Sequence, residues 1–246
     1  MKEYIKKFGD AVVADGYVIE DIPFTTSVET NPIQNLVCNQ EGKKLVNVGG
    51  IIQIQSAGPE MVDLGLSVKW AKYNIGATGG STPESWYGDY YAWGETETKS
   101  DYSWNTYKFG STSPFSKYDT DGKTVLEAVD DIATTIYRSN YRMPTKTEIE
   151  ELIALPNKWV TDYNGVSGLN GRVFTGKNGN TLFIPAAGFF YGSTHNLAGS
   201  SCYLWASSRS SGDPNNAWYL YFISRKIYGS SNSRCSGFSV RCVSTD

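Results

Sequence analysis

The side chains that could perform catalysis are few in this sequence. Its single histidine, His195, lies in the polar segment STHNLAG, which has no local catalytic motif. A nucleophilic triad usually needs a histidine base that a carboxylate orients. The adjacent carboxylates Asp130 and Asp131 lie beside a predicted helix, where capping is the better interpretation. We therefore predict no catalytic residue, and we do not expect the protein to be an enzyme.

Metal ligands are equally sparse. The chain has four cysteines, which are Cys38, Cys202, Cys235 and Cys242. They show no CxxC pairing and no histidine at zinc spacing, so thiols are favoured, with a disulfide among the last three left open. The segments 119–122 (DTDG) and 213–215 (DPN) lack the oxygen ligands that calcium needs and are interpreted as turns. The sequence predicts no metal and no cofactor.

Residues 191–236 have the composition of a recognition surface. They are rich in Tyr, Ser, Gly and Asn, which antibody loops use for aromatic contact and adaptable hydrogen bonding. The segment AWYLYFI (217–223) predicts a strand whose side chains alternate between two faces. Trp218, Leu220 and Phe222 share the face that suits a core. The other face, with Tyr219, Tyr221 and Ile223, is therefore the predicted binding face.

The candidate ligand-binding residues all lie within this segment. They are Tyr191, His195, Asn196, Ser201, Tyr203, Arg209, Ser210, Tyr219, Tyr221, Ile223, Arg225, Tyr228, Ser230, Ser231, Asn232, Ser233 and Cys235. Arg209, Arg225 and Lys226 could add contacts to anions or aromatic rings. A solvated loop region without a ligand is the alternative interpretation of the same composition.

Two helices are predicted to support this segment. In 124–137, Val125, Val129, Ile132 and Ile136 recur at near-helical spacing. The second helix starts at Thr145, which forms a capping box with Glu148 and precedes the apolar residues Ile149, Leu152 and Ile153. Short strands between polar turns account for most of the remainder, including 181–190, 203–208 and 237–243. Few helices with many short strands predict the α+β class.

The first 58 residues differ from the rest. They contain no Trp, and the segments 12–30 and 43–58 predict short strands. We expect residues 1–58 to attach the protein to a larger structure or to form an oligomer, and residues 59–246 to form the binding domain. A homotrimer through this segment fits, although no heptad repeat supports it. The apolar stretch after the first residues is interrupted by Asp10, Asp15 and Gly16, so neither a signal peptide nor a membrane span is predicted.

Seven phrases of the sequence resemble one family, in the same order. They are MVDLGLSVKWAKYNIGA (61–77), YGDYYAWGET (87–96), DDIAT (130–134), YRMPTKTEIEEL (141–152), LFIPAAGFF (182–190), LWASS (204–208) and GFSVRCV (237–243). Together they resemble the Fibrobacter succinogenes major paralogous domain, over roughly residues 61–243. The resemblance implies a C-type-lectin-like fold of the formylglycine-generating-enzyme branch, with two helices, short twisted antiparallel strands and long loops. The related oxidase works through paired cysteines, onto which Cys235 and Cys242 do not map.

A narrower resemblance concerns the C-terminal segment. It is similar to the variable proteins of diversity-generating retroelements from gut Bacteroidetes and their phages, whose mutagenesis alters adenines. Asn codons can then become codons for Tyr, Ser, Ile, Asp, Gly, His and Cys, and Tyr219, Tyr221 and Ile223 all belong to this set. Lys226 does not. An ordinary family member with polar loops remains the alternative.

These observations predict a surface-recognition protein. With a formal net charge of −3 and no basic run, the chain gives no reason to expect a nucleic-acid partner. The resemblance implies a receptor-binding protein on a phage tail fibre, in the virion, that binds a bacterial surface protein or glycan. An exported adhesin or fimbrial-tip protein at the cell surface is the alternative, and a catalytic relative of the formylglycine-generating enzymes is the alternative from another class.

Overall fold

The chain divides into two compact units, residues 1–58 and 59–246, which we describe separately. The computed structural model describes residues 43–48, 51–56, 58–111, 113–138 and 140–245. In the first unit, β1 (Lys43–Val48) and β2 (Ile51–Ser56) form an antiparallel pair with Leu45 opposite Ile54. The strands predicted within 43–58 are thus confirmed, while those predicted within 12–30 lie outside the described residues.

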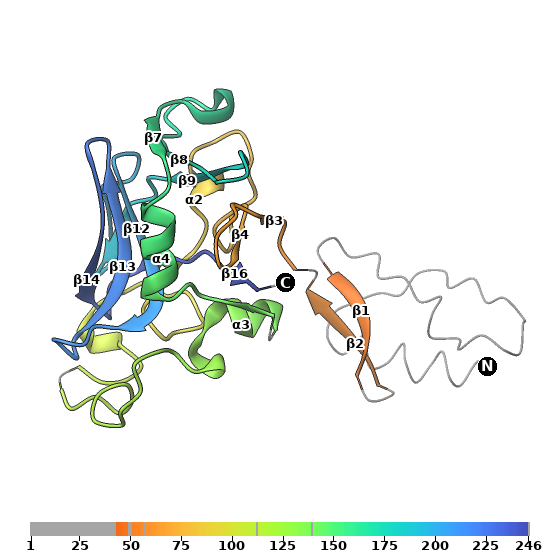
Figure 1. Ribbon diagram of the computed structural model, residues 1–246. Coiled ribbons are helices and arrows are strands. Elements are labelled where there is room, and N and C mark those ends of the chain that lie inside the picture. The colour runs from red at the N-terminus through yellow and green to blue at the C-terminus, as the bar shows by residue number, and fades with distance from the viewer. Residues whose placement is uncertain (1–42, 49–50, 57, 112, 139, 246) are drawn as a thin grey trace, which may run out of the picture. The chain divides into compact units, whose positions relative to one another are not determined.

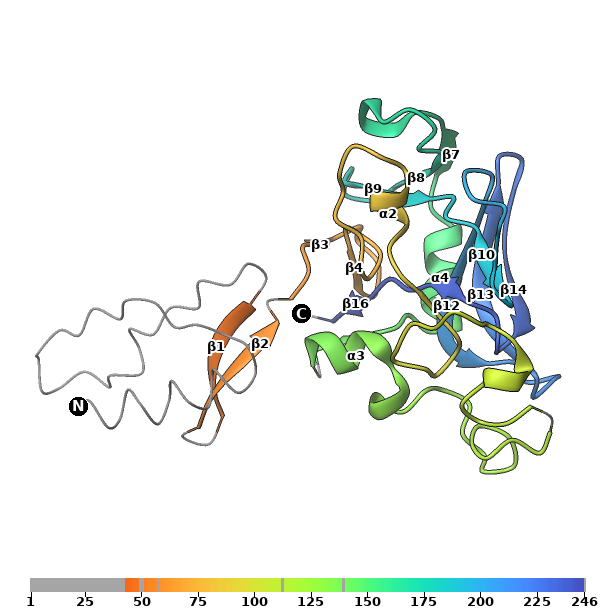
Figure 2. The same ribbon diagram turned by 180° about the vertical axis from the view of Figure 1, so that it is seen from behind.

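The second unit is mixed α+β, with many strands and few helices (Figures 1 and 2). The largest sheet of the described residues contains β5 (Tyr90–Tyr91), β12 (Ser201–Arg209), β13 (Asn216–Ile223), β14 (Lys226–Ser233) and β15 (Phe238–Ser239). A second sheet contains β3 (Met61–Val62), β4 (Lys69–Ala71), β6 (Tyr141–Arg142) and β16 (Val243–Ser244). A third contains β7 (Asn157–Val160), β8 (Gly171–Thr175) and β9 (Thr181–Pro185). A separate hairpin pairs β10 (Phe189–Tyr191) with β11 (Thr194–Asn196). The α-helices of the described residues are α2 (Glu84–Tyr87), α3 (Ile132–Tyr137) and α4 (Lys146–Ile153).

The largest sheet carries the candidate binding segment. Its strand order is β14-β13-β12-β15-β5, and only the β12–β15 pair is parallel. The long strands β12, β13 and β14 follow one another along the chain, so they form a meander at one side of the unit (Figure 1). The last strand, β16, pairs with both β4 and β6, which joins the end of the chain to the start of this unit.

The helix predicted from Thr145 is confirmed. The Thr145 hydroxyl accepts a hydrogen bond from the Glu148 amide at 3.3 Å, and the Glu148 carboxylate accepts one from the Thr145 amide at 2.7 Å. This capping box begins α4, whose Ile149 and Leu152 are buried against the sheet. Among the described residues no helix is long and apolar enough to cross a membrane.

The continuous helix predicted over 124–137 is wrong in its first half. Leu126 and Arg209 donate backbone hydrogen bonds to Ser207 and Thr124, so this part of the chain runs beside the end of β12. A 3-10 turn, η3 (Ala128–Asp130), follows, and α3 begins only after Asp131, whose carboxylate caps the Thr134 amide. The predicted apolar stripe does not form, because Val125 and Val129 are 42% and 71% exposed. The short helix α2 was not predicted.

Strands β12 and β13 separate two apolar clusters. One face of the two strands carries Leu204, Leu220 and Phe222 and packs with α4 in a mainly aliphatic cluster. The other face carries Trp205 and Tyr219 in a mainly aromatic cluster. Because side chains alternate between the two faces of a strand, residues that are adjacent in the sequence belong to different clusters.

Candidate binding face

Four rows of paired residues cross β12, β13 and β14 on the aromatic side of the sheet. Because residues that pair across strands point to the same side, the register defines this surface, which we call the tyrosine face. Its rows are Ser201–Ile223–Lys226, Tyr203–Tyr221–Tyr228, Trp205–Tyr219–Ser230 and Arg209–Ala217–Asn232. Each row begins on the interior strand β12 and ends on the edge strand β14.

Tyrosine rings form a continuous row across the three strands. The ring centroids of Tyr203 and Tyr221 are 5.1 Å apart, and those of Tyr221 and Tyr228 are 5.0 Å apart. Tyr203 also stacks on Tyr219, at 5.5 Å with an interplanar angle of 6°. Such contacts hold each ring in one orientation and add about 0.5–1.5 kcal/mol per pair beyond the area they bury.

Exposure rises steadily from the interior strand to the edge strand. Tyr203 on β12 is 8% exposed, Tyr221 on β13 is half-buried, and Tyr228 on β14 is 45% exposed. Burial raises the pKa of the Tyr219 hydroxyl, although hydrogen bonds with Ser230 and Asn232 oppose that rise. The outer half of the tyrosine face therefore offers aromatic rings, a hydroxyl and an amide to solvent on a fixed base.

The tip of the β13–β14 hairpin is held from beneath by Arg172. Its Nη2 donates to the carbonyl oxygens of Ile223 and Ser224, both at 3.0 Å, and its Nη1 donates to Asn157 Oδ1 at 2.6 Å. Arg172 lies on β8 and is buried. A turn that two carbonyl contacts restrain in this way loses less entropy when it binds a partner.

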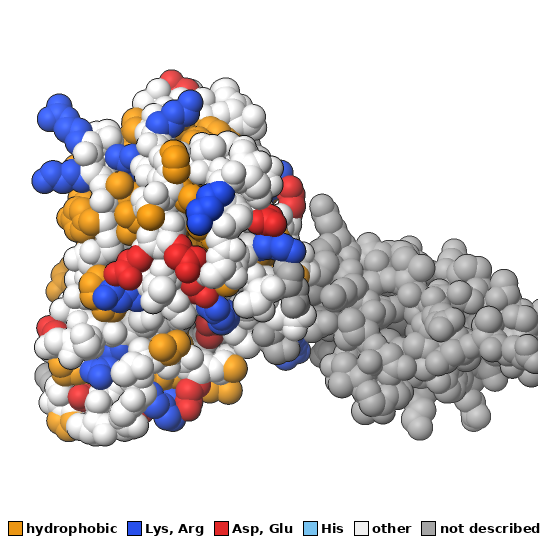
Figure 3. Space-filling model, viewed as in Figure 1, with side chains coloured by type: hydrophobic (Ala, Val, Ile, Leu, Met, Phe, Trp, Pro, Cys, Tyr) orange, Lys and Arg blue, Asp and Glu red, His pale blue; other side chains and the backbone are white. Residues whose placement is uncertain are grey.

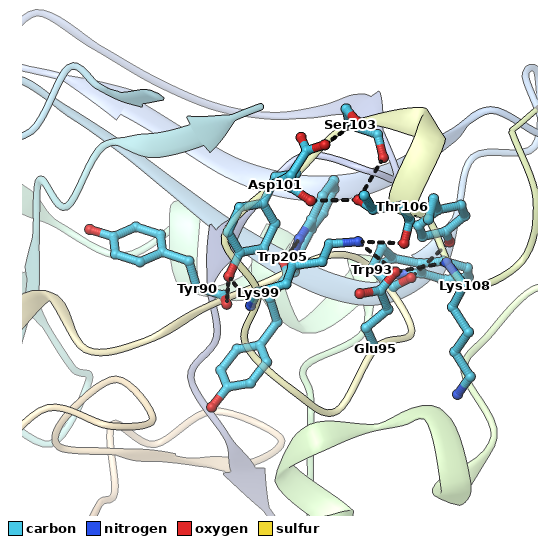
Figure 4. Close-up of polar contacts among 12 residues, drawn as sticks. Tyr90, Trp93, Glu95, Lys99, Asp101, Ser103, Thr106, Lys108 and Trp205 are labelled. Carbon is cyan, nitrogen blue, oxygen red and sulfur yellow. Dashed lines mark hydrogen bonds and ion pairs between the residues drawn. The ribbon is translucent and has the colours of Figure 1, made fainter. Parts of the chain in front are cut away.

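Two tryptophans hold the inner edge of the face. Trp205 Nε1 donates to the Tyr91 carbonyl and Trp93 Nε1 to the Ala206 carbonyl, each at 2.9 Å. Figure 4 shows the polar network beside them, in which Glu95 Oε1 accepts from Lys99 Nζ and from the Lys108 amide, both at 2.9 Å. These contacts satisfy Glu95 within the fold, so we assign this network to the scaffold.

Nine of the predicted ligand-binding residues belong to the tyrosine face. They are Ser201, Tyr203, Arg209, Tyr219, Tyr221, Ile223, Tyr228, Ser230 and Asn232. Ser201 and Tyr203 on β12 and Tyr219 on β13 are buried, so their predicted direct contact with a ligand does not fit the structure. These three residues support the exposed members of the face.

Other predicted residues are turned away from this surface. Ser231 and Ser233 pair with Trp218 and Asn216, and strand alternation therefore places them on the opposite side of β14. Ser210 and Cys235 are buried outside the four rows, so neither can touch a ligand in this conformation. Composition suggested these positions, but the direction of each side chain decides its role.

The remaining predicted residues divide between a second hairpin and the turn. Tyr191, His195 and Asn196 lie on β10 and β11, which form a separate sheet. His195 Nε2 lies 2.9 Å from the Ala187 carbonyl oxygen and 3.0 Å from the Tyr90 hydroxyl. The imidazole also stacks on Phe190 at 4.6 Å, so His195 anchors its hairpin, although its ring is exposed.

Lys226 is an exposed member of the face that the sequence analysis named only as a possible additional contact. It opens β14 in the same row as Ile223, and Arg225 precedes it in the turn. The period-two alternation from Tyr228 back to Lys226 was the available signal. It was outweighed by the observation that a Lys codon does not arise from an Asn codon.

The three cysteines of the described residues are free thiols. Burial raises the pKa of Cys235 to about 11 and that of Cys242 to about 12, and it also raises the pKa of Cys202. A thiol with a raised pKa has little of the thiolate that acts as a nucleophile or metal ligand. Within the described part of the chain, no three His, Cys, Asp or Glu side chains come together in a way that could hold a metal ion.

No protein-family model, no curated protein and no solved structure matches this chain.

Proposed function

We propose that this protein is a surface-recognition protein of the receptor-binding type, which binds a bacterial surface ligand through the outer half of its tyrosine face. The observation that carries the proposal is the rise in exposure from Tyr203 to Tyr228 along one row of stacked rings. Aromatic rings that are exposed and yet held rigidly give contact area at a small entropic cost. Ser230 and Asn232 add hydrogen-bonding groups beside them.

The family resemblance supports the same proposal. A C-type-lectin-like fold is our proposal for the second unit, and its α+β architecture and short strands are compatible with it. We further propose that Tyr221, Ile223, Tyr228 and Ser230 are diversified by a retroelement. The backing residues Leu220 and Phe222 face the other core, so substitution on the tyrosine face leaves their packing in place.

The burial and the hydrogen bonds of the cysteine and histidine side chains favour a binding function over a catalytic one. The oxidase to which the fold is related needs accessible paired cysteines, whereas Cys235 and Cys242 are buried and have raised pKa values. The single histidine uses its Nε2 within the fold. For location we propose the phage tail, with a bacterial cell surface as the alternative, and we propose residues 1–58 as the attachment or trimer-forming segment.

Binding to intact cells tests this function. The fluorescently labelled full chain is incubated with a panel of gut Bacteroidetes strains, and bound protein is measured by flow cytometry. Replacing Tyr221 and Tyr228 together by Ala should weaken binding at least about tenfold, because buried interface tyrosines commonly contribute more than 1 kcal/mol each. Val129→Ala is the matched control, since Val129 is exposed and lies off the tyrosine face.

Two outcomes would contradict the proposal. A chain that binds no strain in the panel is not a receptor-binding protein for these hosts, and a Tyr221→Ala/Tyr228→Ala variant that binds like the wild type has its site elsewhere. Diversification is tested separately by deep sequencing of the 3′ end of the gene in a growing population. Changes at codons 221, 223, 228 and 230 with constant codons 220 and 222 are expected, and a uniform 3′ end would remove the retroelement proposal.

A further inference from the structure

Charge is distributed unevenly between the two parts of the second unit. Residues 59–190 contain twelve Lys or Arg and sixteen Asp or Glu, a net charge of −4, whereas residues 191–245 contain five Lys or Arg and one Asp, a net charge of +4. The candidate binding segment is therefore the basic part of an acidic protein. Charges arranged in this way attract partners of the opposite sign.

The cations of the two parts are also paired differently. Every ion pair between described side chains lies within residues 60–150. None of the five cations of residues 191–245 forms an ion pair with a described side chain. The single acid of this segment, Asp213, is already occupied, because its two carboxylate oxygens accept from Asn215 and Asn216 at 2.7–2.9 Å. Two of the five, Arg234 and Arg241, are buried, so Arg209, Arg225 and Lys226 are the cations of this segment that can meet a partner, and none of them forms an ion pair with a described side chain.

Two of these cations belong to opposite ends of the tyrosine face. Lys226 lies in the first row, and Arg225 beside it in the turn is likewise exposed. Lys and Arg side chains project over the tip of the β13–β14 hairpin at the upper left of Figure 3. Arg209 lies in the last row, opposite Ala217. The Arg209 side chain is half-buried, and its buried Nε has no hydrogen-bond partner among the described residues.

The distance between these ends limits the kind of ligand. Ala217 and Ile223, which share rows with Arg209 and Lys226, are six residues apart on one strand, a separation of about 20 Å at the usual rise per residue. Between them lie tyrosine rings, a hydroxyl and an amide without charge. A compact anion would reach one end only, whereas an extended chain with repeated negative charges would reach both.

From this arrangement we propose that the ligand of the tyrosine face is a carboxylate-bearing polysaccharide. The inference depends on the proposed function and names its ligand class. The carboxylates pair with Lys226 and Arg225 at the hairpin tip and with Arg209 at the far end. Sugar rings between them pack on Tyr221 and Tyr228.

The composition of the face favours a glycan over an acidic protein. The outer half of the tyrosine face is poor in aliphatic side chains, because Ile223 is its only branched aliphatic residue and is half-buried. Tyrosine hydroxyls, Ser230 and Asn232 instead present donors and acceptors next to ring faces. Pyranose rings carry both kinds of complementary surface, since their C–H faces are apolar and their edges are hydroxylated.

The test compares two double variants of the full chain that lose the same charges. Arg225→Gln/Lys226→Gln removes one Arg and one Lys from the tip, and Arg138→Gln/Lys177→Gln removes one of each from exposed positions elsewhere. Binding to immobilised polygalacturonate, to neutral dextran and to poly-glutamate is measured at several salt concentrations. We expect binding to polygalacturonate alone, weakening with salt, and a loss of about tenfold in the tip variant only. The Arg209→Gln variant should also bind more weakly.

Each other outcome overturns the inference. Equal binding to dextran, equal effects of the two double variants, or an unaffected Arg209→Gln variant would exclude an extended anionic ligand. Tighter binding to poly-glutamate would assign the site to an acidic protein, and no binding to polygalacturonate would exclude the class. The cell-binding assay separates this failure from that of the proposed function: strains that bind the wild type but not Tyr221→Ala/Tyr228→Ala leave receptor binding intact.

Discussion

The two faces of the β12–β14 sheet differ in what covers them. On the scaffold face, Leu204, Leu220 and Phe222 are fully buried in the cluster that also contains residues of α4, β8 and β9. On the tyrosine face, side chains on the same strands pass from buried at β12 to exposed at β14. One face is closed by α4 and by residues of β8 and β9, whereas the other opens gradually to solvent. Residues that stabilise the fold and residues that are free to contact a partner can therefore alternate along the same strand. A substitution on one face need not disturb the packing of the other face.

The largest expected difference between the faces is in stability. Phe222→Ala leaves a cavity beside Trp159 and Phe174 and should lower the free energy of unfolding by about 3–5 kcal/mol. Tyr228→Ala removes a ring that is 45% exposed and should change it by about 1 kcal/mol or less. Urea denaturation followed by circular dichroism measures both.

A conservative variant controls for this comparison. Phe222→Leu retains most of the buried volume and should recover much of the loss. If Tyr228→Ala were as destabilising as Phe222→Ala, the tyrosine face would be a second structural core rather than a surface, and the separation of roles would fail.

Local signals predicted the parts of this architecture that local interactions determine. The capping box of Thr145 and Glu148 is complete within four residues, and the alternation of 217–223 depends only on strand geometry, so both were readable. The segment at Val125 was misassigned because its partner, the end of β12, lies some eighty residues further along the chain. The position of Ser201 also depends on a contact outside its own strand, since its carbonyl accepts a hydrogen bond from the Gly188 amide.

The next largest effect on stability should come from Asp130, which accepts hydrogen bonds from side chains of the loop between residues 108 and 118. Burial alone would raise the pKa of this carboxyl, but hydrogen bonds from Lys108, Lys117 and Tyr118 outweigh it and lower the pKa. A lowered pKa means that the stabilisation is present above the unfolded pKa near about 4 and is lost as the pH falls through the folded value. Asp130→Asn should lower the free energy of unfolding by about 1.5–3 kcal/mol at pH 7.

The pH dependence distinguishes this ionic contribution from a packing defect. Between neutral pH and the acid range, the stability difference between wild type and Asp130→Asn should shrink, because the wild-type carboxylate also becomes protonated. Thermal unfolding at a series of pH values measures it. A difference that stays constant down to the lowest pH would mean that Asp130 acts by shape and hydrogen bonding alone, without its charge.

The smallest and sharpest comparison uses two adjacent serines on opposite faces. Ser230 shares a row with Tyr219 and hydrogen-bonds with it, whereas Ser231 pairs with Trp218 on the other side. Ser230→Ala should lower the free energy of unfolding by about 0.5–1.5 kcal/mol, because a half-buried hydrogen bond is lost. It should also weaken cell binding several-fold, because one polar contact to the ligand is lost. Ser231→Ala should leave both stability and binding within error. Equal effects of the two substitutions would mean that β14 does not divide its side chains between structure and recognition, even though its register separates them.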